Sequence, residues 1–310
     1  MRALLALMAV LAVACGGGSP VAPTSTPTPT PAPTPAPAPS RITINATLTD
    51  TVSGAVIGAS SQDVAALPAT ITVSAGGHLA RTTRVSTATP TIDLIPDSAP
   101  FSLTFYRQLA RNAFDDPAAM RPLFMLSQAP SFYLQTTGLS GGTISRFISA
   151  IREVVPAMTG GRFAASTIEM GDELRPDQPG WITIEIVPKA DDLRIDGVQA
   201  CGQAYVGRPS GHVRITTGLQ NGCGLGADPL APVILQHEVA HALGFFHIDL
   251  PGSLMFPGGP GSYQWQNTKI TDGERYHASV AYRRQAGNSD PDIDPTTATP
   301  LRITDRLAID

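Results

Sequence analysis

The stretch from His237 to His247 reads HEVAHALGFFH, and its spacing decides how the rest of the chain is interpreted. His237 and His241 are four residues apart, so on an α-helix both side chains project from one face, about one turn apart. Two imidazoles placed in this way can hold one metal ion at roughly 2.0–2.1 Å. Helices commonly end at a glycine in the left-handed conformation, so Gly244 would turn the chain and bring His247 back as a third ligand. Three protein ligands leave one position open for water, which is typical of a catalytic zinc site.

Glu238 lies directly beside the first of these histidines. A carboxylate at this position can reach a water bound to the metal, take its proton and return it to a leaving amine. The metal lowers the pKa of that water from roughly 15.7 to 7. The pattern therefore predicts one Zn2+ held by His237, His241 and His247, with Glu238 as the catalytic residue. Two alternatives stay open: the histidines are ordinary surface or core residues, or the protein binds metal without turnover.

These positions match the HExxHxxGxxH signature of the metzincin metalloproteases at every fixed residue. The later run Ser253–Pro257 reads SLMFP and resembles the family's methionine turn beneath the metal, with Met255 as a packing residue and not a ligand. The alternative for Met255 is an ordinary core methionine. The combination is most similar to the matrixin-like branch, over about residues 130–285. The resemblance implies an α+β zincin catalytic domain, with a mixed sheet, an active-site helix and a C-terminal helix, that acts as a zinc endopeptidase.

The residues before this region show a different pattern. Apolar and polar residues alternate in short stretches, among them Ile42–Leu48, Ile71–Val73, Ile92–Leu94 and Phe101–Phe105. Such alternation, with turn-forming residues between the stretches, predicts short strands. We therefore expect a small β-sandwich-like accessory domain over 41–108, which could serve as a spacer or as a prodomain that blocks the site.

The segment 109–290 is predicted to form the catalytic domain, and 291–310 a C-terminal tail. Period-two and helical spacings of apolar residues indicate the elements around the histidine motif. The expected elements are strands at Phe132–Gln135, Trp181–Val187, Ala204–Val206 and Val213–Thr216, a helix over Ile144–Val155 with Thr143 as N-cap, and a helix that begins with a Thr271–Glu274 capping box.

The N-terminus predicts export. Residues 1–14 combine one positive charge with a short apolar stretch, which is typical of a signal peptide and too short to span a bilayer comfortably. The small residues before Cys15 resemble a bacterial lipobox, in which that cysteine is lipidated, and 15–40 would be a Pro-rich tether. We expect a lipoprotein anchored in the bacterial cell envelope, at the outer membrane or cell surface. A plain signal peptide and a secreted protein are the alternative.

Two smaller features lie between the predicted strand Trp181–Val187 and the histidine motif. Cys201 and Cys223 are expected to form a disulfide after export, closing a loop that could contribute about 3 kcal/mol. Zinc ligation by the pair, or two free thiols, are the alternatives. Asp191, Asp192 and Asp196 could hold Ca2+ through oxygen ligands, although a solvated acidic loop explains them as well.

Composition limits the partners. The formal net charge is −4 and no basic block occurs, so a nucleic-acid partner is not expected. The expected partners are a peptide or protein substrate and a membrane, reached through the lipid anchor, and we expect a monomer. One alternative function is a surface binding or adhesion lipoprotein with a vestigial zinc-protease fold. Another is an enzyme that cleaves non-protein amides such as cell-wall peptides.

Overall fold

The computed structural model describes residues 40–297, apart from 189–192, 196–197, 217–230 and 258–267. The predicted signal peptide, Cys15 and the tether up to residue 39 lie outside the described residues. Within the described part, no helix is both long and apolar enough to cross a bilayer.

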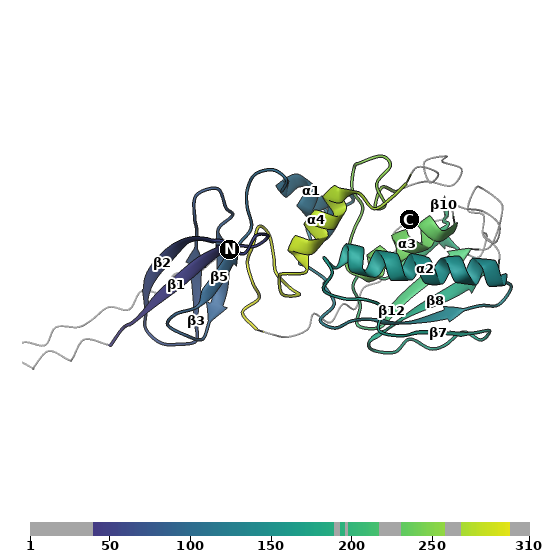
Figure 1. Ribbon diagram of the computed structural model, residues 1–310, viewed down its shortest axis with the longest axis horizontal. Helices are drawn as coiled ribbons and strands as arrows, with labels where there is room; N and C mark the ends of the chain where they lie inside the picture. Colours follow the sequence, from purple (N-terminus) through teal and green to yellow (C-terminus); the bar gives the residue numbers. More distant parts are fainter. Residues whose placement is uncertain (1–39, 189–192, 196–197, 217–230, 258–267, 298–310) are drawn as a thin grey trace, which may run out of the picture. The chain divides into compact units, whose positions relative to one another are not determined.

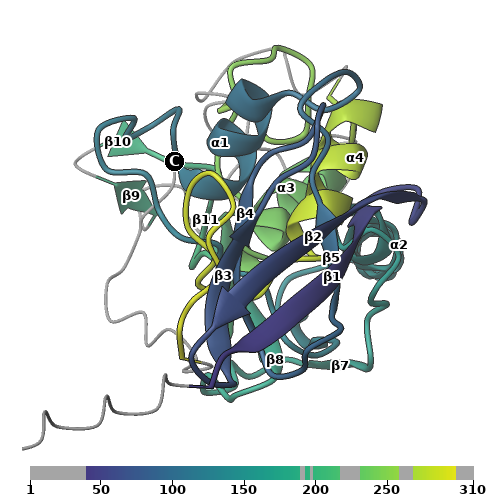
Figure 2. The same ribbon diagram turned by 90° about the vertical axis from the view of Figure 1, so that its left-hand side faces the viewer.

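The first five strands form a small β-rich unit with its own apolar cluster. Strand β1 (Ile42–Asp50) pairs antiparallel with β2 (Val56–Val64) and parallel with β5 (Thr91–Leu94), while β3 (Ala69–Val73) and β4 (Arg81–Val85) form a separate antiparallel pair. These strands are turned toward the viewer in Figure 2. The strands predicted by period-two alternation at Ile42–Leu48, Ile71–Val73 and Ile92–Leu94 are therefore confirmed. Alternate side chains of these strands share one buried cluster: Ile44, Ala46, Leu48, Ile71, Val73, Val85, Ile92 and Leu94.

The strand predicted at Phe101–Phe105 is wrong, because this segment begins helix α1 (Leu103–Arg111). The Ser102 hydroxyl caps the helix by accepting the backbone N–H of Phe105 at 3.3 Å. Tyr106 and Leu109 are fully buried at helical spacing, and this packing outweighs the short alternation. Both belong to the large core of the chain and not to the cluster formed by β1–β5. The expected accessory segment 41–108 thus contains the first part of a helix that packs with the rest of the protein.

A five-stranded mixed sheet organises the second half of the chain, which gives the α+β class that the sequence predicts. Its order is β11-β12-β8-β6-β7, and all neighbours are parallel except the edge pair β11 and β12. Figure 1 shows helices α2 and α3 lying along one side of this sheet. The bounds are β6 Ser131–Gln135, α2 Gly141–Met158, β7 Ile168–Gly171, β8 Trp181–Val187, β11 Gly202–Ala204, β12 Gly211–Thr216 and α3 Ala231–Ala242, with a further short pair β9 Arg194–Ile195 and β10 Val198–Gln199.

Most elements predicted around the histidine motif are confirmed, with corrections at the start of one helix and at the bounds of one strand. Helix α2 is capped by Ser140 and not by Thr143, because the Ser140 hydroxyl accepts the Thr143 N–H at 3.1 Å. The expected strand at Ala204–Val206 begins earlier, at Gly202, and ends at Ala204.

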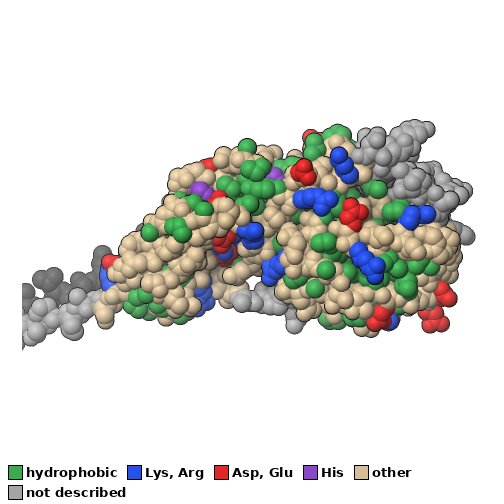
Figure 3. Space-filling model, viewed as in Figure 1, with side chains coloured by type: hydrophobic (Ala, Val, Ile, Leu, Met, Phe, Trp, Pro, Cys, Tyr) green, Lys and Arg blue, Asp and Glu red, His purple; other side chains and the backbone are tan. Residues whose placement is uncertain are grey.

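Helix α4 (Asp272–Ala281) has the predicted capping box, since the side chains of Thr271 and Glu274 each accept a backbone N–H of the other residue. Of the predicted tail 291–310, the structure describes 291–297, and this part is not a free tail. Asp292 is buried and its carboxylate lies 2.8 Å from Nε of buried Arg284. On the face shown in Figure 3, basic and acidic side chains are interspersed and form no large area of one sign.

Candidate metal centre

Helix α3 and the turn after it bring the three predicted ligands together. His237 and His241 lie on one face of α3, which ends at Ala242. Gly244 then has a φ of +108°, and a Cβ there would lie 2.6 Å from the carbonyl oxygen of Phe124, so only glycine fits this turn. The chain returns with His247, and all three imidazoles are buried.

The three imidazole rings converge on one point. The Nε2 atoms of His237 and His241 are 3.0 Å apart, and the ligand atoms of all three histidines lie within 4.8 Å of one another. The ring of His247 is 5.3 Å from that of His237 and 4.9 Å from that of His241, centroid to centroid. Zn–N bonds of 2.0–2.1 Å in a tetrahedron place two nitrogens about 3.3 Å apart, so this separation suits a shared metal.

Hydrogen bonds at the Nδ1 atoms of the three histidines leave each Nε2 atom facing the centre. His237 Nδ1 lies 2.6 Å from the Leu254 carbonyl oxygen, and His241 Nδ1 lies 2.7 Å from that of Phe245. His247 Nδ1 lies 3.2 Å from a carboxylate oxygen of Asp115. Carbonyl and ionised carboxylate oxygens only accept, so each Nδ1 carries the hydrogen and each Nε2 presents a lone pair.

Burial keeps the imidazoles of His237 and His241 neutral. It lowers the pKa of His237 to about 3, with the neighbouring His247 adding to the effect. Burial also holds the pKa of His241 well below its usual value, and His237 and His247 act in the same direction. Neutral imidazoles are the form that binds metal ions.

The donor set fits a zinc ion. Two lone pairs that face each other at 3.0 Å, as those of His237 and His241 do, repel unless a cation lies between them. His247 Nε2 is buried and has no hydrogen-bond partner among the described residues. A buried polar atom normally has a partner, and a metal shared with His237 and His241 would supply one to this nitrogen. In the described part of the chain, this triad is the one group of His, Cys, Asp or Glu residues arranged in this way.

Glu238 is 2% exposed and lies against the edge strand β11. A Cβ added to Gly202 of that strand would lie 2.3 Å from Glu238 Oε1, so the absent side chain of the glycine leaves the space for the carboxylate. The predicted catalytic carboxylate thus lies in the space that Gly202 leaves at the sheet edge.

Met255 is fully buried in a turn that is bonded to the centre on one side and to α4 on the other. The Leu254 carbonyl of this turn accepts from His237, as described above. The backbone N–H of Met255 donates to Glu274 Oε1 at 2.8 Å, and its carbonyl accepts from Ile248 N at 2.9 Å. The turn therefore couples α4 to the first ligand and to the residue after the third ligand.

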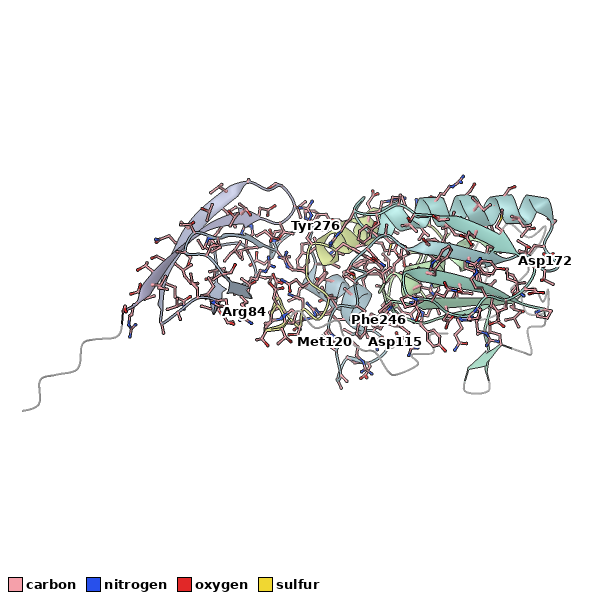
Figure 4. All side chains as sticks on the ribbon, turned by 90° about the horizontal axis from the view of Figure 1, so that it is seen from below. Arg84, Asp115, Met120, Asp172, Phe246 and Tyr276 are labelled. Atoms are coloured by element: carbon pink, nitrogen blue, oxygen red, sulfur yellow. The ribbon has the colours of Figure 1, made fainter. Side chains whose placement is uncertain are left out.

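Sequence reasoning missed Asp115 and the role of Glu274 beyond its cap. Asp115 is far from His247 in the sequence and lies near Phe246 in Figure 4. No local pattern marks it, because a contact between a loop and a distant histidine leaves no periodic signal. The sequence identified Glu274 only as a capping residue. In the structure its side chain is fully buried, which is unusual for an acid unless several hydrogen-bond donors surround it.

The remaining predicted site residues are only partly described. Cys201 is disulfide-bonded, while Cys223, its expected partner, lies outside the described residues. The proposed calcium ligands Asp191, Asp192 and Asp196 also lie outside them.

His212 lies between two carboxylates. Its Nδ1 is 2.7 Å from Asp177 Oδ1 and its Nε2 is 3.0 Å from Glu185 Oε2. The two oxygens contact opposite nitrogens of one ring, so these three groups do not converge on a single ion. The hydrogen bonds from His212 and from Arg214 keep the pKa of Glu185 below its usual value, although burial opposes them.

None of the three histidines lines the cavity of about 740 Å³ that the structure contains. Several arginines do, but those with described partners are engaged in packing. Arg162 donates to the Tyr282 carbonyl at 2.7 Å, and Arg284 is paired with Asp292. These contacts leave the histidine centre as the candidate site for chemistry.

The sequence matches no protein-family model and no curated protein. Among solved structures, the chain is similar to high choriolytic enzyme 1, a hatching enzyme zinc-protease from Oryzias latipes (Medaka fish). The identity is 16% and the TM-score is 0.30, and the match covers 51% of this chain and 92% of the other. At this level of likeness, a function for this chain has to be argued from the residues of its own site.

Proposed function

We propose that the chain is a zinc-dependent endopeptidase of the metzincin, matrixin-like type. The observation that carries the proposal is the convergence of three buried imidazoles, from His237, His241 and His247, whose Nδ1 atoms are each held by an acceptor. Such a set leaves a coordination position open, as catalytic zinc sites do.

The protein groups around this centre have separate roles. When bound, zinc polarises a substrate carbonyl and makes water more acidic. Glu238 accepts the proton of the attacking water and passes it to the leaving nitrogen, and Gly202 keeps its carboxylate at the sheet edge. Met255 supports the ligands through packing, in the manner of a methionine turn. A positioned acid–base group typically contributes 10²–10⁴-fold, about 3–5 kcal/mol of barrier.

The proposal extends to the setting of the enzyme. Peptides or proteins are the substrates, and the monomer is exported and anchored in the bacterial envelope through lipidated Cys15. The strands within 42–94 form a β-rich accessory segment before the catalytic domain. The supporting observations are the apolar N-terminal stretch, the lipobox-like residues before Cys15 and the strands of 42–94.

The test compares Glu238→Gln with the wild type in two measurements. We expect both to bind one zinc per chain by elemental analysis, and only the wild type to cleave casein, with a loss of roughly 10²–10⁴-fold in the variant. Glu169→Gln is the matched control, because Glu169 is an acid on β7 that pairs with Arg175. Undiminished cleavage by Glu238→Gln would remove the catalytic role. A wild type that binds zinc but shows no chelator-sensitive cleavage would favour a binding protein instead.

A further inference from the structure

We propose that Asp115 is a positioning residue for the third metal ligand, and that helix α1 delivers it. Metal retention then depends on a helix that comes before the catalytic sheet in the chain. This inference rests on the proposed function, because it assigns a role toward the same zinc ion.

The contact itself is a charged hydrogen bond at His247 Nδ1. The two carboxylate oxygens of Asp115 lie 3.3 Å and 3.2 Å from this nitrogen. A carboxylate that accepts at Nδ1 fixes the tautomer, and it also makes the imidazole a stronger donor at Nε2. Of the two ring nitrogens of His247, the metal-facing Nε2 has no hydrogen-bond partner among the described residues.

Helix α1 holds the backbone on both sides of His247. The N–H of Phe246 donates to the Leu109 carbonyl at 2.8 Å, and the N–H of Asp249 donates to Gln108 Oε1 at 3.1 Å. The segment that carries the third ligand is therefore bonded to α1 just before and just after the histidine. These contacts place the ligand segment against the end of the helix from which Asp115 follows.

The chain reaches Asp115 through a fixed turn. Asn112 ends α1 in the left-handed conformation, with a φ of 63°. The N–H of Asp116 then donates to the Asn112 carbonyl at 2.9 Å, which closes one further turn around Asp115. The carboxylate is thus presented by a hydrogen-bonded turn and does not depend on its own packing, in keeping with a side chain that is 37% exposed.

His247 differs from the other two ligands in the origin of its acceptor. His237 and His241 donate to the backbone carbonyls of Leu254 and Phe245, which no side-chain substitution removes. The acceptor of His247 is a side chain, so a single substitution tests its role. Asp116, the residue after Asp115, supplies a control, because the described hydrogen bond of the Asp116 side chain is accepted from Ala119 N at 3.2 Å.

The experiment measures zinc affinity by competition with a chromogenic chelator for the wild-type full chain, Asp115→Asn, Asp115→Glu and Asp116→Asn. We expect Asp115→Asn to weaken zinc binding by roughly 10–100-fold, and Asp115→Glu to recover part of this loss. Asp116→Asn removes the same charge one residue away and should stay within about two-fold of the wild type. The visible absorption of bound Co2+ should shift in Asp115→Asn and not in Asp116→Asn, a change that general destabilisation would not produce.

Zinc affinity of Asp115→Asn within about two-fold of the wild type, with an unchanged Co2+ spectrum, would overturn the inference while leaving the proposed function intact. A failure of the proposed function alone would give a different result. If Asp115→Asn loses affinity but Glu238→Gln still cleaves substrate at the wild-type rate, the positioning role stands and the catalytic assignment fails. A wild type that takes up no zinc would overturn both.

Discussion

Replacing Glu274 by glutamine tests how α4 supports the metal centre. The buried carboxylate accepts four hydrogen bonds: from the backbone N–H of Met255 at 2.8 Å, of Leu254 at 3.3 Å and of Thr271 at 2.7 Å, and from the Thr271 hydroxyl at 2.8 Å. A glutamine side chain has nearly the same shape but only one acceptor oxygen. Its amide nitrogen can donate and cannot accept.

The loss of stability in Glu274→Gln depends on which of the four hydrogen bonds the glutamine can still accept. The best arrangement keeps the oxygen where three donors meet, at the Oε2 position, and turns the amide toward the N–H of Met255. One bond to a charged acceptor, worth about 1.5–3 kcal/mol, is then lost, and a buried donor is left unsatisfied at about 1–3 kcal/mol. Burial raises the pKa of Glu274, so the neutral amide recovers part of this cost. We expect a net destabilisation of about 2–3 kcal/mol, which corresponds to a Tm roughly 4–12 °C lower.

The assay is urea unfolding in excess chelator, so that metal binding does not contribute to the free energy. Glu274→Ala serves as a second variant that removes all four bonds, and Glu169→Gln, at a half-exposed ion pair, is the control. The glutamine variant should also bind zinc more weakly, because the Leu254 carbonyl that orients His237 belongs to the released turn. A Glu274→Gln variant within about 0.5 kcal/mol of the wild type would refute the reasoning.

Three further outcomes are expected. Gly202→Ala should lower kcat while leaving zinc content unchanged, because the new methyl occupies the space of the Glu238 carboxylate; equal kcat would show that the carboxylate acts from elsewhere. Burial lowers the pKa of His277 in the folded protein, so below pH 6.5 the unfolded chain binds more protons than the folded chain does. The free energy of unfolding therefore falls as the pH drops through this range. It should fall less steeply in His277→Gln, which denaturant unfolding at several pH values would measure. Arg284→Met leaves Asp292 buried without its cation and should cost about 3–5 kcal/mol in denaturant unfolding, a prediction that a loss below about 1 kcal/mol would contradict.

The histidine centre could be predicted because its geometry is local. The spacing of four positions from His237 to His241 fixes their relation on any helix, and Gly244 marks where that helix stops. The capping box at Thr271 is local in the same sense and was also predicted correctly. For these two features the residue spacing alone was sufficient.

Helix α1 shows why other parts could not be predicted. Within 101–105 the apolar residues alternate as in a strand, and only the packing of Tyr106 and Leu109 into the large core decides for a helix. Ser102, which caps the helix, was a signal that could have been used. Asp115 offered no comparable signal, because its contact with His247 exists only once α1 and the third-ligand segment have met.

The acceptors that hold the three rings come from distant parts of the chain: the turn after α1, the loop after α3 and the turn before α4. An excised peptide spanning His237 to His247 contains only one of the three. An unfolded chain therefore carries the three ligands without the acceptors that orient His237 and His247. The complete set of acceptors forms only once the tertiary structure has assembled, so the proposed metal centre is a product of the whole fold and not of the motif alone.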